Sequence, residues 1–112
     1  MSHKQTEYDL EMRIRLLITA EGGRHMDIGG YSIEFYSCPI DRGDAHMYDS
    51  RVWLYGPRLK LGESYKVTAS LLDAEHSLAR FQAGDQVTLW ERRTIGRGTV
   101  VDVRVKPERR GQ

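Results

Sequence analysis

The chain has 112 residues, of which 39% are hydrophobic and 29% are charged, and its formal net charge is +1. This length and composition predict one soluble globular domain. They exclude a membrane-spanning helix, because no apolar run approaches the roughly 20 residues that a bilayer requires. The near-neutral charge also excludes a global electrostatic attraction to nucleic acid.

The N-terminal part changes from an irregular segment to a strand pattern. Residues 1–10 have no hydrophobic period and predict a flexible arm. Residues 11–19 alternate strictly, which predicts a half-buried strand with inward Met12, Ile14, Leu16 and Ile18. Leu17 breaks the alternation, so we expect it to be an exposed apolar contact.

Two polar loops flank the next strand. Residues 20–30 contain two Gly-Gly pairs and predict a loop. Residues 31–37 alternate again and predict a strand, in which Tyr36 is expected to point outward. Residues 38–50 are mostly polar and predict a second loop.

Residues 51–55, 63–72 and 86–91 predict three further strands. The inward side chains of the second are expected to be Tyr65, Val67, Ala69 and Leu71. In the third, Trp90 falls opposite the aliphatic residues, so we expect it to be exposed. Residues 78–81 fit either a short strand or one helical turn.

The longest β-type run covers residues 94–105. Its alternation places Val101, Val103 and Val105 on one side of a strand. Gly96 and Gly98 precede these valines and indicate a bend, a bulge or a close backbone contact. A long strand with a glycine corner is what closing a small barrel requires.

These elements together predict an all-β fold. Six or seven short strands, regular turn signals and no convincing helix favour a closed six-stranded antiparallel β-barrel. We expect the barrel to cover residues 11–105, with a charged tail at residues 106–112.

Signals for catalysis, metal binding and nucleotide binding are weak. His46 shares a loop with three aspartates, Asp41, Asp44 and Asp49, but their spacing fits no established calcium loop. Cys38 as a nucleophile needs an adjacent base, which no histidine spacing supplies, and a packed side chain is the alternative. The glycine pairs lack the Lys-Ser or Lys-Thr of a phosphate loop. We predict a non-enzymatic protein with no metal or cofactor.

Cysteine usage and charge distribution add two expectations. Cys38 is the single cysteine, so an internal disulfide is excluded, and with no apolar N-terminal signal region we expect a cytoplasmic protein. Residues 91–112 hold seven Lys+Arg against three Asp+Glu, whereas residues 1–49 hold five against nine. Either a local anion-binding face or solvated strand faces explain this asymmetry.

Five basic residues are candidates for phosphate contact because they lie beside glycines or turns whose backbone amides are exposed: Arg24, His25, Arg92, Arg93 and Arg97. The alternative is that the arginines pair with nearby acids and that Trp90 covers one end of the barrel.

Four motifs lie at a characteristic order and spacing. They are EGGRH at Glu21–His25, GYxxxFY at 30–36, GESYKV at Gly62–Val67 and RTIGRGTVV at Arg93–Val101. Together they resemble the third domain of elongation factor Tu, the C-terminal β-barrel of that translation GTPase, over residues 11–105.

The resemblance implies a six-stranded antiparallel barrel. In the family this barrel contacts the T-stem backbone of aminoacyl-tRNA and packs against the GTPase domain. The matching RNA-contact positions are Arg24, His25 and the turn before Arg93. The family has a glutamate and two glycines before that arginine, whereas this chain has Glu91 and Arg92.

The function we expect is a binding module that contacts structured, tRNA-like RNA in a translation-related role through the five basic residues. The alternative is a module that binds a GTPase-like or other protein partner through Leu17, Tyr36 and Trp90. We expect no membrane contact and no nucleotide binding by this chain alone.

Overall fold

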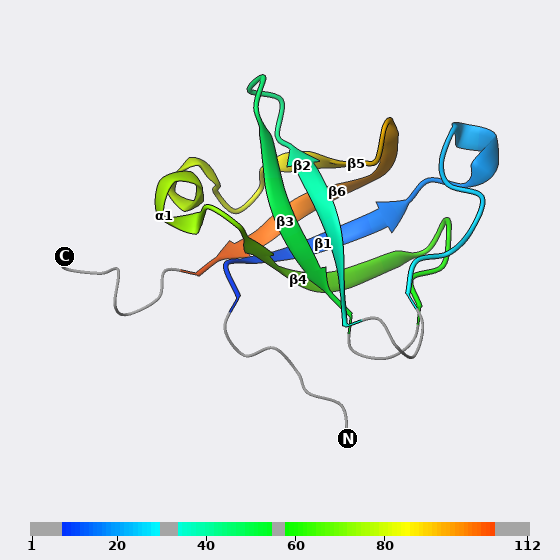
Figure 1. Cartoon of the computed structure of the whole chain (residues 1–112), viewed down its shortest axis with the longest axis horizontal. Coiled ribbons are helices and arrows are strands. Elements are labelled where there is room, and N and C mark those ends of the chain that lie inside the picture. The colour runs from blue at the N-terminus through cyan, green and yellow to red at the C-terminus, as the bar shows by residue number, and fades with distance from the viewer. Residues whose placement is uncertain (1–7, 30–33, 55–57, 105–112) are drawn as a thin grey trace.

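The computed structural model describes residues 8–29, 34–54 and 58–104, and its strands close into an antiparallel barrel (Figure 1). The strands are β1 (Leu10–Leu16), β2 (Phe35–Asp41), β3 (Met47–Trp53), β4 (Ser64–Leu71), β5 (Gln86–Trp90) and β6 (Thr94–Val103). Their order around the barrel is β1-β4-β3-β2-β5-β6. The predicted fold class, a closed six-stranded antiparallel barrel, is confirmed.

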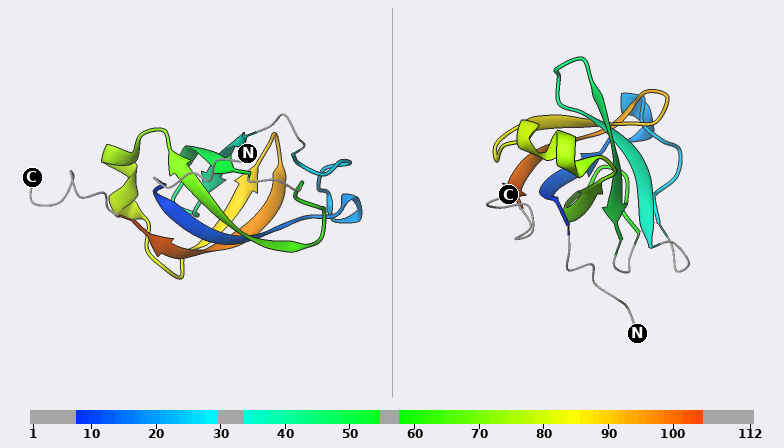
Figure 2. Two further views of the ribbon diagram at one scale, coloured as in Figure 1. Left: turned by 90° about the horizontal axis from the view of Figure 1, so that it is seen from below. Right: turned by 60° about the vertical axis from the view of Figure 1, so that its left-hand side comes forward.

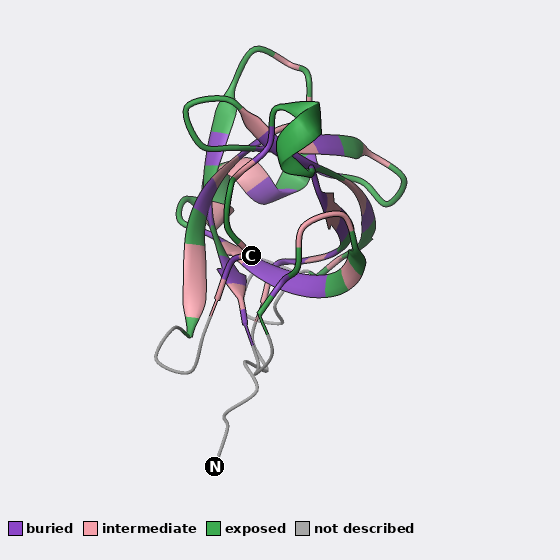
Figure 3. Ribbon diagram, turned by 90° about the vertical axis from the view of Figure 1, so that its right-hand side faces the viewer, coloured by how far each residue is buried: buried purple, intermediate pink, exposed green. Residues whose placement is uncertain are grey.

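Strand β1 lies between β4 and β6 and supplies the centre of the core (Figure 2). Its inward residues are at most 1% exposed: Leu10, Met12, Ile14 and Leu16. The predicted inward residues Val67, Ala69 and Leu71 of β4 are buried as well. In β1 buried positions alternate with less buried ones, which confirms the period-two interpretation of that segment. In β4 the predicted inward positions are buried, but Thr68 between them is buried as well, so the alternation there is incomplete. Figure 3 shows the burial of each described residue on the ribbon.

The alternation ends with β1, and this reverses two predictions. The backbone leaves the strand after Leu16 and enters a 3₁₀ turn at Thr19–Glu21. Leu17 is only 7% exposed, and its N–H donates to the carbonyl of Ile95 at 2.9 Å. Ile18, predicted to face inward, is 39% exposed. Leu17 is therefore a core residue and not an exposed apolar contact.

The β2–β3 hairpin replaces most of the loop predicted for residues 38–50. Strand β2 continues to Asp41 and β3 begins at Met47, so only residues 42–46 form the turn. Cys38, Ile40 and Tyr48 are buried. Ser50 is buried too, and its hydroxyl donates to the carbonyl of Cys38 at 2.7 Å. The prediction failed because polar outward residues and a buried serine hid the strand period.

A β-bulge explains why Val101 does not face the core. Glu11 pairs with Asp102, but Met12 pairs with Val100, so Val101 is an extra residue on β6. Val101 is 42% exposed, whereas Val100 is buried. The prediction that Val101 and Val103 share one side of the strand is wrong, because Val103 packs against the core and Val101 is exposed. Val105 lies outside the described residues.

Asp9 ties the start of the barrel to its other strands. Its N–H donates to the carbonyl of Ala69, its carboxylate accepts the N–H of Leu71, and its carbonyl accepts the N–H of Arg104. The predicted arm at residues 1–10 is therefore too long, since Asp9 is buried and β1 begins at Leu10. Residues 1–7 and the predicted tail at residues 106–112 lie outside the described residues.

The ambiguous segment near residue 78 is helical. A short helix, α1 (Ala74–Ser77), continues into a 3₁₀ turn at Leu78–Arg80 near the end of the barrel where β6 finishes (Figure 1). Leu78 and Phe81 are buried there. Within the described ranges, no helix combines the length and apolar character needed to cross a bilayer.

The two glycines of β6 permit close contact with β1. A Cβ atom at Gly98 would lie 2.8 Å from the carbonyl oxygen of Arg13 and 2.8 Å from the Cγ2 of Ile14. A Cβ atom at Gly96 would lie 3.1 Å from the carbonyl oxygen of Arg15. The sequence signal of a close backbone approach at these glycines is therefore confirmed.

We expect Gly98→Ala to destabilise the barrel by about 1–3 kcal/mol, because the added methyl group has no room against β1. Urea denaturation measures this difference. Thr99→Ala, one residue along the same strand and pointing outward, is the control and should change stability by less than about 0.5 kcal/mol. Equal effects of the two variants would contradict the close-contact explanation.

Candidate nucleic-acid interface

The barrel is least completely closed between β2 and β5, where only two residue pairs form: Ile40 with Leu89 and Asp41 with Thr88. The carbonyl of Asp49 accepts the N–H of Leu72, just after β4, so the backbone carbonyl of Asp49 points toward β4. Pro39 is the partner of Asp49 on β2, and its backbone polar groups therefore point away from β3 and toward β5. Because proline has no N–H to donate, the ladder ends there.

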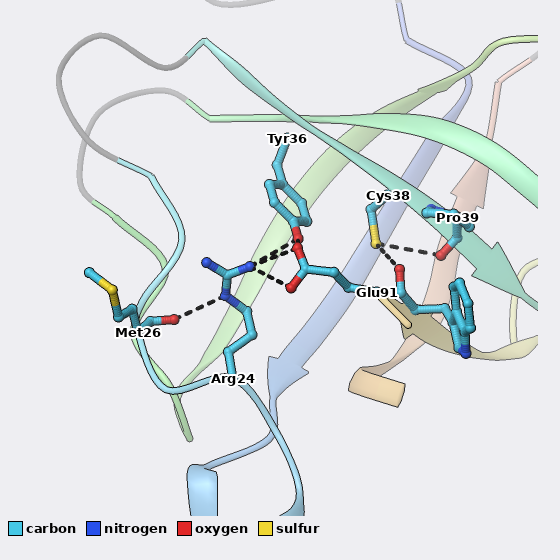
Figure 4. Close-up of polar contacts among 7 residues, drawn as sticks. Arg24, Met26, Tyr36, Cys38, Pro39 and Glu91 are labelled. Carbon is cyan, nitrogen blue, oxygen red and sulfur yellow. Dashed lines mark hydrogen bonds and ion pairs between the residues drawn. The ribbon is translucent and has the colours of Figure 1, made fainter. Parts of the chain in front are cut away.

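Side chains hold the seam beyond this point (Figure 4). The thiol of Cys38 lies 3.6 Å from the carbonyl oxygen of Trp90. Next to it, the Nη1 of Arg24 lies 2.8 Å from both carboxylate oxygens of Glu91 and 3.1 Å from the hydroxyl of Tyr36. The Tyr36 hydroxyl also donates to Glu91. We call Arg24, Tyr36 and Glu91 the seam cluster.

The glycine-rich loop after β1 positions Arg24. Gly22 has a φ of +89°, a left-handed conformation that glycine adopts without strain. Gly23 has no room for a side chain, because a Cβ atom there would lie 2.3 Å from the carbonyl oxygen of Leu17. The hydroxyl of Thr19 then donates to the carbonyl of Arg24 at 2.8 Å, and the Nε of Arg24 donates to the carbonyl of Met26 at 3.0 Å.

The turn between β5 and β6 has three residues, Glu91, Arg92 and Arg93. The N–H of Glu91 donates to the carbonyl of Arg93 at 2.8 Å. Arg92 has a φ of +64°, which places a long charged residue in the left-handed region that favours glycine. Both arginines are exposed, and neither lies within ion-pairing distance of an acidic side chain among the described residues.

The structure brings some of the predicted RNA-contact residues together. The Arg24–Glu91 ion pair joins the glycine-rich loop to the turn that carries Arg92 and Arg93. His25 is exposed next to Arg24. Arg97 is also exposed, on the outer face of β6, four residues beyond the turn. Arg24 forms an ion pair with Glu91, as the alternative prediction of pairing with a nearby acid has it.

The three predicted protein-contact residues differ in how far they are exposed. Leu17 is buried, as described above. Tyr36 is half-buried on the same side of β2 as Cys38 and Ile40, and it packs against the core, so the expectation that it points outward is wrong. Trp90 is 40% exposed, as predicted.

Cys38, weighed as a nucleophile, and Asp44, weighed as a metal ligand, both have contacts within the barrel. Burial raises the pKa of the Cys38 thiol to about 11, and little reactive thiolate exists at neutral pH. The hydrogen bond from Tyr48, with the guanidinium of Arg42, lowers the pKa of Asp44 to about 2. Among residues 8–29, 34–54 and 58–104, no group of three or more histidine, cysteine, aspartate or glutamate side chains is arranged to hold a metal ion.

Glu91 belongs to the seam cluster, although sequence reasoning did not single it out as a site residue. It lies 67 positions from Arg24, and no local pattern links the two. The general expectation that arginines pair with nearby acids was the one signal that applied to it.

Comparison of the chain with known protein families and with curated protein sequences found no match. The resemblance to the third domain of elongation factor Tu therefore remains an interpretation of the four sequence motifs.

We expect Arg92→Gly to stabilise the barrel by about 0.5–1 kcal/mol. The left-handed conformation costs a non-glycine residue roughly 1–2 kcal/mol, and the greater freedom of glycine in the unfolded chain offsets about half of the relief. Ala45→Gly is the matched control, because Ala45 in the β2–β3 turn has a φ of +68° and no charge. Chemical denaturation should show similar gains for both variants; a loss of stability in Arg92→Gly would mean that its side chain stabilises the turn.

Proposed function

We propose that this barrel is a non-enzymatic binding module that contacts the phosphate backbone of structured RNA. The observation that carries the proposal is the β5–β6 turn, where Arg92 and Arg93 are exposed, without an ion-pair partner among the described residues, and held partly in a backbone conformation that disfavours arginine. A strained residue kept at the surface suggests a role for its side chain.

The side chains of the turn suit phosphate better than bases. A guanidinium group makes bidentate hydrogen bonds to phosphate oxygens. Contacts to phosphates orient a nucleic acid without selecting its sequence. Trp90 is next to the turn and half-exposed, and it offers one apolar surface for a ribose or an unpaired base.

Arg24 and His25 extend this surface into the glycine-rich loop. The Arg24–Glu91 pair is partly exposed, with 23% and 43% of the two side chains accessible. A phosphate that binds Arg24 takes the place of the Glu91 carboxylate, so one anionic hydrogen-bond acceptor of the guanidinium replaces another. The motif resemblance points to tRNA and to a translation-related role, which we include in the proposal.

The second candidate, a protein-contact module for a GTPase-like or other partner, now rests mainly on Trp90. Leu17 and Tyr36 are buried or engaged within the chain. Binding through an apolar tryptophan depends weakly on salt, whereas binding through arginines depends on it strongly. Salt dependence therefore separates the two candidates.

The decisive experiment measures binding of labelled tRNA, and of an unrelated structured RNA, across a salt series. We expect affinity to fall steeply with salt, and Arg93→Ala to reduce the slope of log K against log salt by roughly 0.7–0.9 for the one lost phosphate contact. Arg51→Ala, on β3 across the barrel, is the control. Absence of RNA binding at low salt would reject the proposal, and equal weak binding to both RNAs would reject the preference for tRNA.

Glu91→Gln tests whether the carboxylate competes with RNA for Arg24. We expect about fivefold tighter tRNA binding at 0.1 M salt, because the change removes a negative charge and releases a guanidinium group. Glu75→Gln makes the same charge change on α1, at the opposite end of the barrel (Figure 1). If both variants bind tRNA equally, only net charge matters and Arg24 is not part of the interface.

A further inference from the structure

Two polar rows cross the outer face of the barrel over β1, β6 and β5. In the first row, Arg15 pairs with Arg97, and Arg97 pairs with Thr88. In the second row, Arg13 pairs with Thr99, and Thr99 pairs with Gln86. The rows lie outside because the neighbouring positions on β1 face the core. We call Arg13, Arg15 and Arg97 the basic face.

The charges on the basic face are only partly compensated. Arg15 and Arg97 are directly opposite on adjacent strands, an arrangement of like charges that destabilises a sheet. Glu21 lies near both: it pairs with Arg15 at 3.1 Å, and its pKa is lowered first by the Ile18 N–H, then by Arg15, with a smaller contribution from Arg97. Arg13 is exposed and has no acidic side chain within ion-pairing distance among the described residues.

A shallow hollow borders the basic face. Its volume is about 370 Å³. It is lined by Arg97, Thr88, Gln86, Val87, the last residue of β2 (Asp41) and the first two residues of the β2–β3 turn (Arg42 and Gly43). This is the low end of the volumes found for small-molecule sites, roughly 300–1,000 Å³. Arg42 turns toward Asp44 and Asp85, so Arg97 is the cation of the hollow that lacks an ion pair among the described residues.

The basic face is continuous with the β5–β6 turn. Arg97 follows Arg93 by four residues on β6, a distance of about 13 Å along a strand. Arg15, on β1, is the partner of Arg97 on β6. Arg13 lies about 6.7 Å from Arg15 along β1, in the direction away from the turn. These backbone positions form a row of arginines that leads from the turn onto β1, in which the Arg15 guanidinium is held by Glu21 and by the carbonyl of Gly62.

We propose that the basic face is a second RNA-backbone site, which holds phosphates of the same RNA molecule beyond the turn, with a ribose–phosphate unit in the hollow beside Arg97. The inference rests on the proposed function and adds Arg13 and Arg15 to it. None of the outward residues in the two rows is aromatic, so this site reads backbone charge and not base identity.

Arg13→Gln is the test, because Arg13 makes no described ion pair or side-chain hydrogen bond whose loss would disturb the fold. We expect it to weaken tRNA binding about fivefold to tenfold at 0.1 M salt and to lower the salt slope by roughly 0.7–0.9. Arg51→Gln is the matched control, an exposed arginine on β3, which lies across the barrel from β6. It should leave both quantities unchanged.

A length series gives a second readout. A short RNA hairpin that reaches only the turn should respond to Arg93→Ala and not to Arg13→Gln, whereas full-length tRNA should respond to both. If wild-type protein binds tRNA and Arg93→Ala weakens it, but Arg13→Gln behaves like Arg51→Gln, the basic face is overturned and the proposed function stands. If wild-type protein binds no RNA at low salt, both proposals fail.

Discussion

The architecture of the candidate interface depends on where backbone pairing between β2 and β5 stops. Pro39 cannot donate a ladder hydrogen bond, so the barrel closes through two residue pairs and is completed by side chains. Tyr36 packs against the core, and Arg24 and Glu91 join the glycine-rich loop to the β5–β6 turn. This arrangement places the glycine-rich loop beside the β5–β6 turn, although the two are far apart in sequence.

Two local features lower the stability of the barrel, and both involve arginines at its surface. Arg92 adopts a backbone conformation better suited to glycine, and Arg15 is placed opposite Arg97 across a strand pair. Packing does not require either arrangement, because these side chains point away from the core. An anionic ligand offsets the second effect directly, since it screens the repulsion between the paired arginines.

How much the sequence predicts depends on whether a feature is local. Strands β1 and β4 follow from alternation, because each has one buried face. The β2–β3 hairpin was missed since a buried Ser50 and an in-strand Pro39 resemble loop residues. The bulge at Val101 exists only relative to β1, and the Arg24–Glu91 pair needs the closed barrel. The opposition of Arg15 and Arg97 likewise requires the register of two strands, because the two residues are 82 positions apart in sequence.

The hydrogen bonds of Asp9 have a consequence for folding kinetics. They connect the residue before β1 to Ala69 and Leu71 on β4 and to Arg104 just after β6. Strand β1 pairs with β4 along one edge and with β6 along the other. Even the nearer of these strands, β4, begins 48 residues after β1 ends. Such a high contact order predicts slow, cooperative folding in which β1 is incorporated only when the distant strands have formed.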